Sequence, residues 1–168
     1  DHPSHYLTSV VSSSAMSRPV SVGGGPGLAQ VKVWDPKTAE NLHSFRPNPA
    51  GSEIPINCCC MLPKSDHILV CDRSSNTYIM TLHGQVVKTI SSGKKQGGDF
   101  LSACVSRMGN WLYCLAEDQM MYVFSIREGK LEHIVRVHEK EPIGLCQHPH
   151  RNLLASFADD CSLKLWRP

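Results

Sequence analysis

The sequence lacks long apolar runs and lacks a strong excess of charge of one sign. No stretch of about 18 or more apolar residues occurs, and the start, Asp1-His2-Pro3-Ser4, is not a basic segment followed by an apolar one. These absences predict a soluble protein that is not secreted and does not act at a membrane. Lysine and arginine number 17 against 15 aspartates and glutamates. A balance so close to neutral gives no strong field toward phosphate, so we expect no direct nucleic-acid site.

Cysteine motifs typical of metal sites or disulfide scaffolds are also missing. The run Cys58-Cys59-Cys60 has no Cys-x-x-Cys pair nearby, and neighbours on a strand point to opposite faces. We therefore expect no metal and no cofactor. All eight cysteines lie in apolar, strand-like runs, which predicts reduced, buried thiols and a cytosolic or nuclear compartment. They are Cys58, Cys59, Cys60, Cys71, Cys104, Cys114, Cys146 and Cys161.

What the sequence does contain is an internal repeat. Four short strings end in a large residue, and these ends lie 46, 44 and 42 residues apart. Such a period is typical of β-propeller blades, which repeat about every 40–45 residues. The strings are Val31-Lys32-Val33-Trp34, Thr77-Tyr78-Ile79-Met80, Met121-Tyr122-Val123-Phe124 and Leu163-Lys164-Leu165-Trp166.

Each repeat has the composition of four short antiparallel strands. Turn residues follow the first three strings, as in Asp35-Pro36, His83-Gly84 and Glu128-Gly129, and another short apolar run comes after each turn. Two further apolar runs precede a string, for example 101–105 and 111–115. No window keeps the apolar stripe of a helix. The sequence therefore predicts an all-β protein built from WD40-type propeller blades.

Counting the repeats predicts a partial propeller of about three and a half blades whose ring is not closed. Residues 31–52 would end one blade, 53–92 and 93–137 would be complete blades, and 138–168 would lack the outer strand. Residues 1–30 would hold part of a first blade, with residues 12–30 as a flexible Ser/Gly/Pro-rich loop. Open blade edges, such as 163–166, predict self-association.

The last repeat contains the polar residues of the WD40 hydrogen-bond network. Ser156 and Asp160 precede Trp166 by ten and six residues, and His138 precedes Ser156 by 18. We expect His138 to bridge the Ser156 hydroxyl and the Asp160 carboxylate, with Ser156 reaching the Trp166 indole. The other repeats keep remnants, namely Cys114, Asp118 and Phe124 in the third, and Val70, Ser74 and Met80 in the second.

Two sets of polar residues have an alternative interpretation, one catalytic and one phosphate-binding. A hydrolase could use His138, Ser156 and Asp160, but no Gly-x-Ser-x-Gly turn surrounds Ser156, and the Trp166 spacing explains the whole set. We therefore expect no enzyme activity. A phosphate-binding loop around Lys94 and Lys95 lacks the required order of glycines and lysine. An exposed basic connection that touches a partner is the remaining interpretation of these lysines.

The connections between the strands resemble one family, the Smu (suppressor of mec and unc) WD40 splicing factors, over its C-terminal part. The resemblance covers about residues 31–168. It is carried by 73–77 and 83–87, by 91–100, by Val137-His138-Glu139-Lys140, by His148-Pro149-His150, and by the final string through Pro168. Arg73, Lys94 and Lys95 belong to these segments, and we expect them to bind a partner.

This resemblance implies a nuclear, non-catalytic scaffold of the spliceosome that acts in pre-mRNA splicing. Its implied partners are spliceosomal proteins, among them the RED protein. The family uses an N-terminal helical region of LisH type for dimerisation and for RED, and these 168 residues do not include it. An adaptor of a ubiquitin ligase or of another complex is the alternative within the same class.

Overall fold

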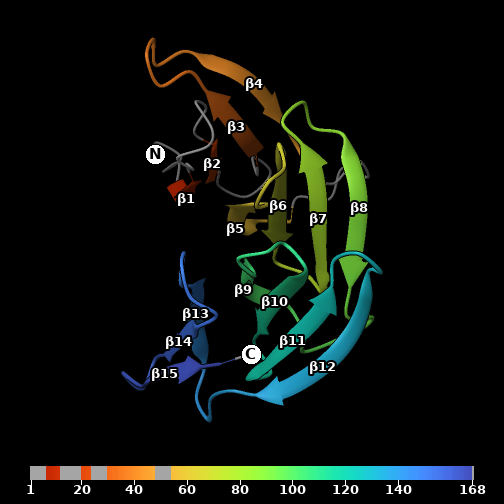
Figure 1. Cartoon of the computed structure of the whole chain (residues 1–168), viewed down its shortest axis with the longest axis vertical. Coiled ribbons are helices and arrows are strands. Elements are labelled where there is room, and N and C mark those ends of the chain that lie inside the picture. The colour runs from red at the N-terminus through yellow and green to blue at the C-terminus, as the bar shows by residue number, and fades with distance from the viewer. Residues whose placement is uncertain (1–6, 12–19, 24–29, 48–53, 168) are drawn as a thin grey trace, which may run out of the picture.

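The structure is a computed structural model, and it describes residues 7–11, 20–23, 30–47 and 54–167. Every regular element in this part of the chain is a β-strand, and the strands form four antiparallel sheets (Figure 1). Strands pair only with their neighbours along the chain, so each sheet is a simple meander. The described residues contain no helix long and apolar enough to cross a membrane.

The four sheets follow one another along the sequence. The first contains β1 (Leu7–Val11), β2 (Val20–Gly23), β3 (Gln30–Trp34) and β4 (Asn41–Phe45). The second contains β5 (Ile56–Met61), β6 (His67–Asp72), β7 (Asn76–Thr81) and β8 (Val86–Ser91). The third contains β9 (Phe100–Val105), β10 (Trp111–Ala116), β11 (Met120–Ser125) and β12 (Lys130–Arg136). The fourth contains β13 (Pro142–Gln147), β14 (Leu154–Ala158) and β15 (Leu163–Trp166).

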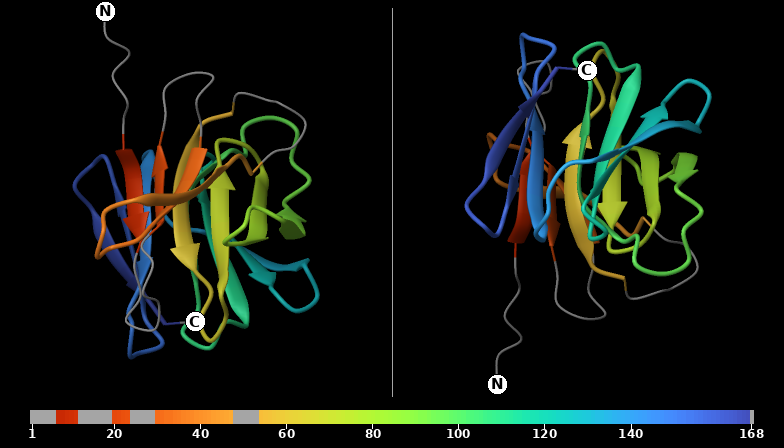
Figure 2. Two further views of the ribbon diagram at one scale, coloured as in Figure 1. Left: turned by 90° about the horizontal axis from the view of Figure 1, so that it is seen from above. Right: turned by 90° about the horizontal axis from the view of Figure 1, so that it is seen from below.

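The sheets stand side by side in an arc, with the first strand of each sheet on the inner side (Figure 1). These inner strands contact one another in the order β1, β5, β9 and β13. The views from above and below show the connections gathered at the two ends of the strands (Figure 2). The ring is not closed among the described strands, which confirms the predicted partial propeller of antiparallel sheets.

The core consists of layers between adjacent sheets. Alternation along β6 shows how they form: Ile68 and Val70 pack toward the first sheet, whereas Leu69 and Cys71 pack toward the third. A central strand is thus buried on both faces, which explains why its sequence is continuously apolar rather than alternating. The layer between the second and third sheets includes the fully buried Phe100.

One prediction for the first sheet is wrong. Residues 12–30 were expected to form a loop without fixed structure, yet Val20–Gly23 form β2, which pairs with both β1 and β3. Val20 is completely buried, and the Ser21 side chain is buried beside Trp34, so this short segment has strand contacts on both sides. Residues 12–19 and 24–29 lie outside the described residues. The first sheet has four strands where only parts of a blade were expected.

The cysteines also differ from expectation at two positions. Cys59, Cys71, Cys104 and Cys114 are buried, and burial raises the pKa of the Cys114 thiol well above its ordinary value. Cys146 and Cys161, however, are exposed. Cys146 points away from the buried Leu145 on the same strand, and Cys161 lies in the β14–β15 turn with a φ of 62° rather than in a strand. The apolar surroundings in the sequence did not distinguish the two faces of β13.

Replacing Gly84 by alanine should destabilise the contact between the first two sheets. Gly84 has a φ of +88°, and a Cβ there would lie 2.6 Å from Cγ of Phe45. Backbone strain and overpacking together should lower the free energy of unfolding by about 2–3 kcal/mol. Gly93→Ala is the control, because Gly93 also has a positive φ but has nothing within 4 Å of its added Cβ. Equal losses for both variants in urea denaturation would contradict the steric part of this prediction.

Candidate functional site

The fourth sheet contains a buried network of polar side chains. The Trp166 indole Nε1 donates to Ser156 Oγ over 2.9 Å, and Ser156 Oγ lies 2.8 Å from Nε2 of His138. His138 and Ser156 are fully buried. A neutral imidazole with its proton on Nδ1 satisfies every member, because Nε2 then accepts the Ser156 hydroxyl proton. The structure therefore brings together three of the four predicted residues.

The fourth predicted residue, Asp160, does not make the expected hydrogen bond to His138. Nδ1 of His138 lies 3.1 Å from Oγ of Ser162 instead, and the Ser162 amide donates to Oδ1 of Asp160 over 2.9 Å. Hydrogen bonds from the Ser162 hydroxyl and amide hold the pKa of Asp160 below its ordinary value. Ser162 therefore bridges the His138 imidazole and the exposed Asp160 carboxylate by hydrogen bonds.

Sequence reasoning missed Ser162 because it assigned the contact with His138 to the carboxylate itself. A local signal was present: an aspartate that accepts the amide of the residue two positions later is a common turn motif. The positive φ of Cys161, between the two residues, completes this turn and places the Ser162 hydroxyl beside the imidazole. Turn geometry, rather than spacing alone, decides which oxygen reaches His138.

Burial makes His138 sensitive to acid. Burial is the main cause that lowers the pKa of His138 below the ordinary value of about 6.5, and the positive charge of Lys164 is the second. The folded state thus favours the neutral ring. The stability that depends on a neutral His138 is fully present above about pH 6.5, and it is lost as the pH falls through the pKa of His138 in the folded state.

We therefore expect the free energy of unfolding to decrease as the pH is lowered below about 6.5, and to decrease less in His138→Gln. Urea denaturation at a series of pH values measures both profiles. The remaining titratable groups are common to the two proteins, so the difference reports on His138. Parallel profiles would show that His138 does not contribute to the acid sensitivity.

The geometry does not suit a serine nucleophile. A nucleophilic hydroxyl must reach its substrate, but Ser156 has no exposed surface. Its oxygen already receives the Trp166 indole proton, and its own proton is directed to His138. The third member of a hydrolase set, Asp160, contacts Ser162 rather than the imidazole. The network therefore stabilises the fourth sheet by linking its strands through buried hydrogen bonds.

The first sheet contains a matching bond that the sequence analysis did not find. The Trp34 indole Nε1 donates to Ser21 Oγ over 2.8 Å. Ser21 lies opposite Lys32 in the β2–β3 register, just as Ser156 lies opposite Lys164. In both sheets the tryptophan comes two residues after that lysine. The shared Lys-x-Trp pattern was the available signal, and it was missed because residues 12–30 were taken as a loop.

The second and third sheets use other polar contacts at the same end. Val70 and Cys114 occupy the position of Ser156, opposite Tyr78 and Tyr122, so neither position provides a serine hydroxyl. Asp118 accepts the Tyr122 hydroxyl proton over 2.6 Å and the Met120 amide proton over 3.1 Å. In the second sheet, the Ser74 hydroxyl donates to Asp72, whose pKa is raised by burial. The polar contacts that stabilise these two sheets therefore do not involve a tryptophan indole.

The three residues predicted to bind a partner lie at one end of the sheets. Arg73 is exposed in the β6–β7 turn, and Lys95 is exposed in the β8–β9 connection. Lys94 forms an ion pair with Asp118, which raises the pKa of the lysine through their hydrogen bond. Its Nζ also donates to the carbonyl oxygen of Gly97 over 3.4 Å. Lys94 therefore links the second and third sheets.

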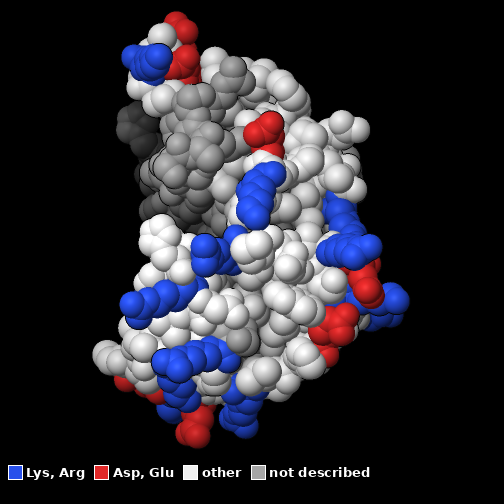
Figure 3. All heavy atoms as spheres, in the orientation of Figure 1, with Lys and Arg blue, Asp and Glu red and all other residues white. Residues whose placement is uncertain are grey.

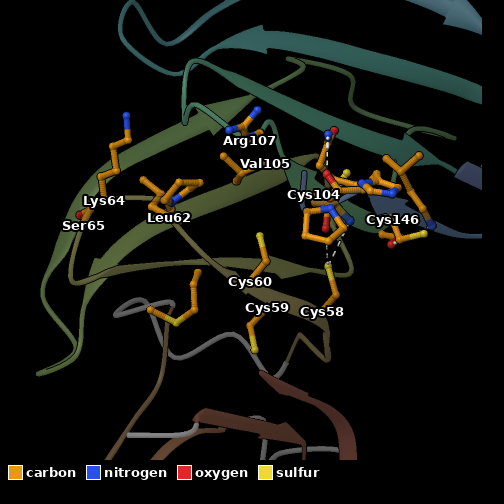
Figure 4. A pocket seen from close by; sticks show the side chains of 18 of the residues that line it. Cys58, Cys59, Cys60, Leu62, Lys64, Ser65, Cys104, Val105, Arg107 and Cys146 are labelled. Carbon is orange, nitrogen blue, oxygen red and sulfur yellow. Dashed lines mark hydrogen bonds between the residues drawn. The ribbon is translucent and has the colours of Figure 1, made fainter. Parts of the chain in front are cut away.

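A second candidate site is an open groove of about 980 Å³ on the inner side of the arc (Figure 4). Its floor is formed by β5, β9 and β13, and its rim by the connections 62–66, 106–110 and 148–153. Lys64 and Arg107 lie around it, and Cys58, Cys60 and Cys146 line it (Figure 4). No group of three or more His, Cys, Asp or Glu residues in the described part of the chain could hold a metal ion.

Comparisons with known proteins agree with this architecture. No protein-family model matches the chain. It is 31% identical over 141 residues to the "WD40 repeat-containing protein smu1" of Dictyostelium discoideum, a match that covers 82% of this chain and 26% of that protein. It is 28% identical over 142 residues to human striatin-4, covering 81% of this chain and 18% of that protein. The chain thus spans about a quarter or less of these relatives.

Among solved structures, the β-propeller domain of Cps50 (Swd1) from Myceliophteria thermophila is similar, with a TM-score of 0.77 and 16% identity. The match covers 98% of this chain and 51% of that domain, and it supports the β-propeller fold. The predicted resemblance to the Smu family is confirmed by the sequence match. The chain is therefore a WD40-repeat protein whose blades correspond to part of the WD40 region of the Smu family.

Proposed function

We propose that this chain is a protein-interaction scaffold and that the protein it belongs to acts in the nucleus in pre-mRNA splicing. The observation that carries the proposal is the sequence match to the Smu relative along most of the chain. The structure is compatible with a scaffold. The buried His138 network stabilises the fourth sheet, and the loops at both ends of the sheets are exposed and available for contacts.

A pull-down from nuclear extract tests this proposal. The tagged chain should enrich spliceosomal proteins, as identified by mass spectrometry. The same chain, denatured by heat before the extract is added, controls for binding that does not need the folded sheets. Recovery of cullin-ligase components without spliceosomal proteins would contradict the splicing role and favour a ubiquitin-ligase adaptor. RED is not the criterion, because the resemblance implies that the family contacts it through an N-terminal helical region rather than through the blades.

A further inference from the structure

Charge is unevenly distributed between the two ends of the sheets. For the second, third and fourth sheets, we define the groove end by the connections 62–66, 82–85, 106–110, 126–129 and 148–153, and the opposite end by 73–75, 92–99, 117–119, 137–141 and 159–162. The groove end carries the cations Lys64, Arg107, Arg127 and Arg151, with Asp66 and Glu128 as its acids. Figure 3 shows Lys and Arg side chains (blue) spread over one face of the molecule, with Asp and Glu side chains (red) mainly toward its margins.

The opposite end has the reverse character. Its acids outnumber its cations, which are Arg73, Lys94, Lys95 and Lys140, and Lys94 is already paired with Asp118. The main acids there are Asp99, Glu117, Glu139, Glu141, Asp159 and Asp160. In these three sheets the groove end is therefore basic and the opposite end acidic.

The rim of the groove presents its cations in a fixed arrangement. Nδ1 of His148 accepts the amide protons of His150 and Arg151 over 3.0 and 3.1 Å, which shapes the β13–β14 turn. Arg107 Nη1 donates to the carbonyl oxygen of His150 over 3.3 Å and so ties two connections together. The guanidinium has further N–H groups, and Arg107 is exposed. It can bind a carboxylate while it holds the rim.

The groove floor favours one kind of anionic partner. Apolar side chains from the inner strands and rim line it, including Met61, Leu62, Val105 and Leu145. Among the described residues that line it there is no Phe, Tyr or Trp, and its aromatic rings are the imidazoles of His148 and His150. Few cations and an apolar floor suit a peptide better than a phosphate backbone.

From these observations we propose that the groove binds an acidic segment of a partner protein, in which carboxylates flank an apolar side chain. Arg107 and Lys64 contact the carboxylates at the rim, and the apolar side chain rests on the floor. Asp66, on the same rim, opposes binding by repulsion. This inference rests on the scaffold function proposed above and names the partner chemistry that one surface of the scaffold recognises.

Binding of a short fluorescein-labelled peptide of glutamates interspersed with leucines tests the proposal by fluorescence anisotropy on the whole chain. Arg107→Glu should weaken binding on the order of tenfold, and Asp66→Asn should strengthen it. Lys140→Glu, an equal change of charge at the opposite end, should leave the affinity unchanged. All three positions are exposed, and a thermal melt confirms that each variant is folded.

Alkylation of two exposed cysteines provides a second test, because one lies in the groove and the other does not. Cys146 lines the groove, whereas Cys161 lies at the opposite end. Bound peptide should slow alkylation of Cys146 by iodoacetamide and leave Cys161 unaffected. Absence of binding, binding insensitive to Arg107→Glu, or equal protection of both thiols would overturn the proposal.

A single-stranded RNA of similar length and a lysine–leucine peptide distinguish other partners. RNA binding as tight as that of the acidic peptide, with the same loss in Arg107→Glu, would assign the groove to phosphate and overturn the proposal. The nuclear pull-down distinguishes failure of the groove proposal from failure of the proposed scaffold function. If splicing proteins are recovered equally by Arg107→Glu and the unchanged chain, while the acidic peptide does not bind, the groove proposal fails and the scaffold function stands.

Discussion

Replacing Phe100 by alanine should lower the free energy of unfolding by about 3–5 kcal/mol, the cost of removing a fully buried phenyl ring. The ring packs edge-on against Tyr122 and Phe124, with centroids 5.8 and 6.2 Å away, so the variant also loses two aromatic contacts. Because β9 contacts both β5 and β13, the cavity would weaken the centre of the arc. Urea denaturation followed by circular dichroism measures the change.

Phe157→Ala provides the matched control for Phe100→Ala. Phe157 lies on β14 and is 42% exposed, so its truncation removes much less buried surface. We expect a loss of about 1 kcal/mol or less. Comparable losses for the two variants would mean that Phe100 is not at the centre of a packed layer, and would place the second and third sheets further apart than the structure does.

Ser156→Ala should be the second most damaging change, with a loss of about 2–4 kcal/mol. The substitution leaves the Trp166 indole N–H and His138 Nε2 without their shared partner in a buried site, and each unsatisfied group costs about 1–3 kcal/mol. A double-mutant cycle with Trp166→Phe should show that the two losses are not additive, because both remove the same bond.

Ser162→Ala is the control for Ser156→Ala. It removes only the hydroxyl at the half-buried end of the network, so we expect a loss of about 1 kcal/mol. Equal effects at the two serines would contradict the assigned order of the network. Ester hydrolysis by the purified chain that disappeared in Ser156→Ala would show that the network has a catalytic rather than a fastening role.

The repeat predicted most of the fold because strand order in this chain is local. Each sheet is one uninterrupted stretch of sequence, so a recurrence of large residues such as Trp34 and Trp166 marks equivalent strands directly. The prediction was wrong at Val20–Gly23 because a serine- and glycine-rich composition was read without its partner strand. The bond between Ser21 and Trp34 exists only once β2 lies beside β3.

The site was predictable to the extent that spacing along strands determines contact. Ser156 and Trp166 lie on paired strands, so their separation in the sequence places them together. Asp160 lies in a turn, where a single positive φ at Cys161 decides which side chain faces the imidazole, and spacing carries no such information. The groove could not be predicted either, because Lys64, Arg107 and His150 come from three separate sheets.

The opposite signs of charge at the two ends of the second, third and fourth sheets give this part of the molecule an electric dipole directed along the strands. Partners of opposite charge would then be turned toward different ends before they touch it, at distances up to the screening length of about 8 Å at physiological salt. Orientation of this kind raises association rates more than it raises final affinity. The acidic segment proposed for the groove should therefore associate faster at low salt than at high salt.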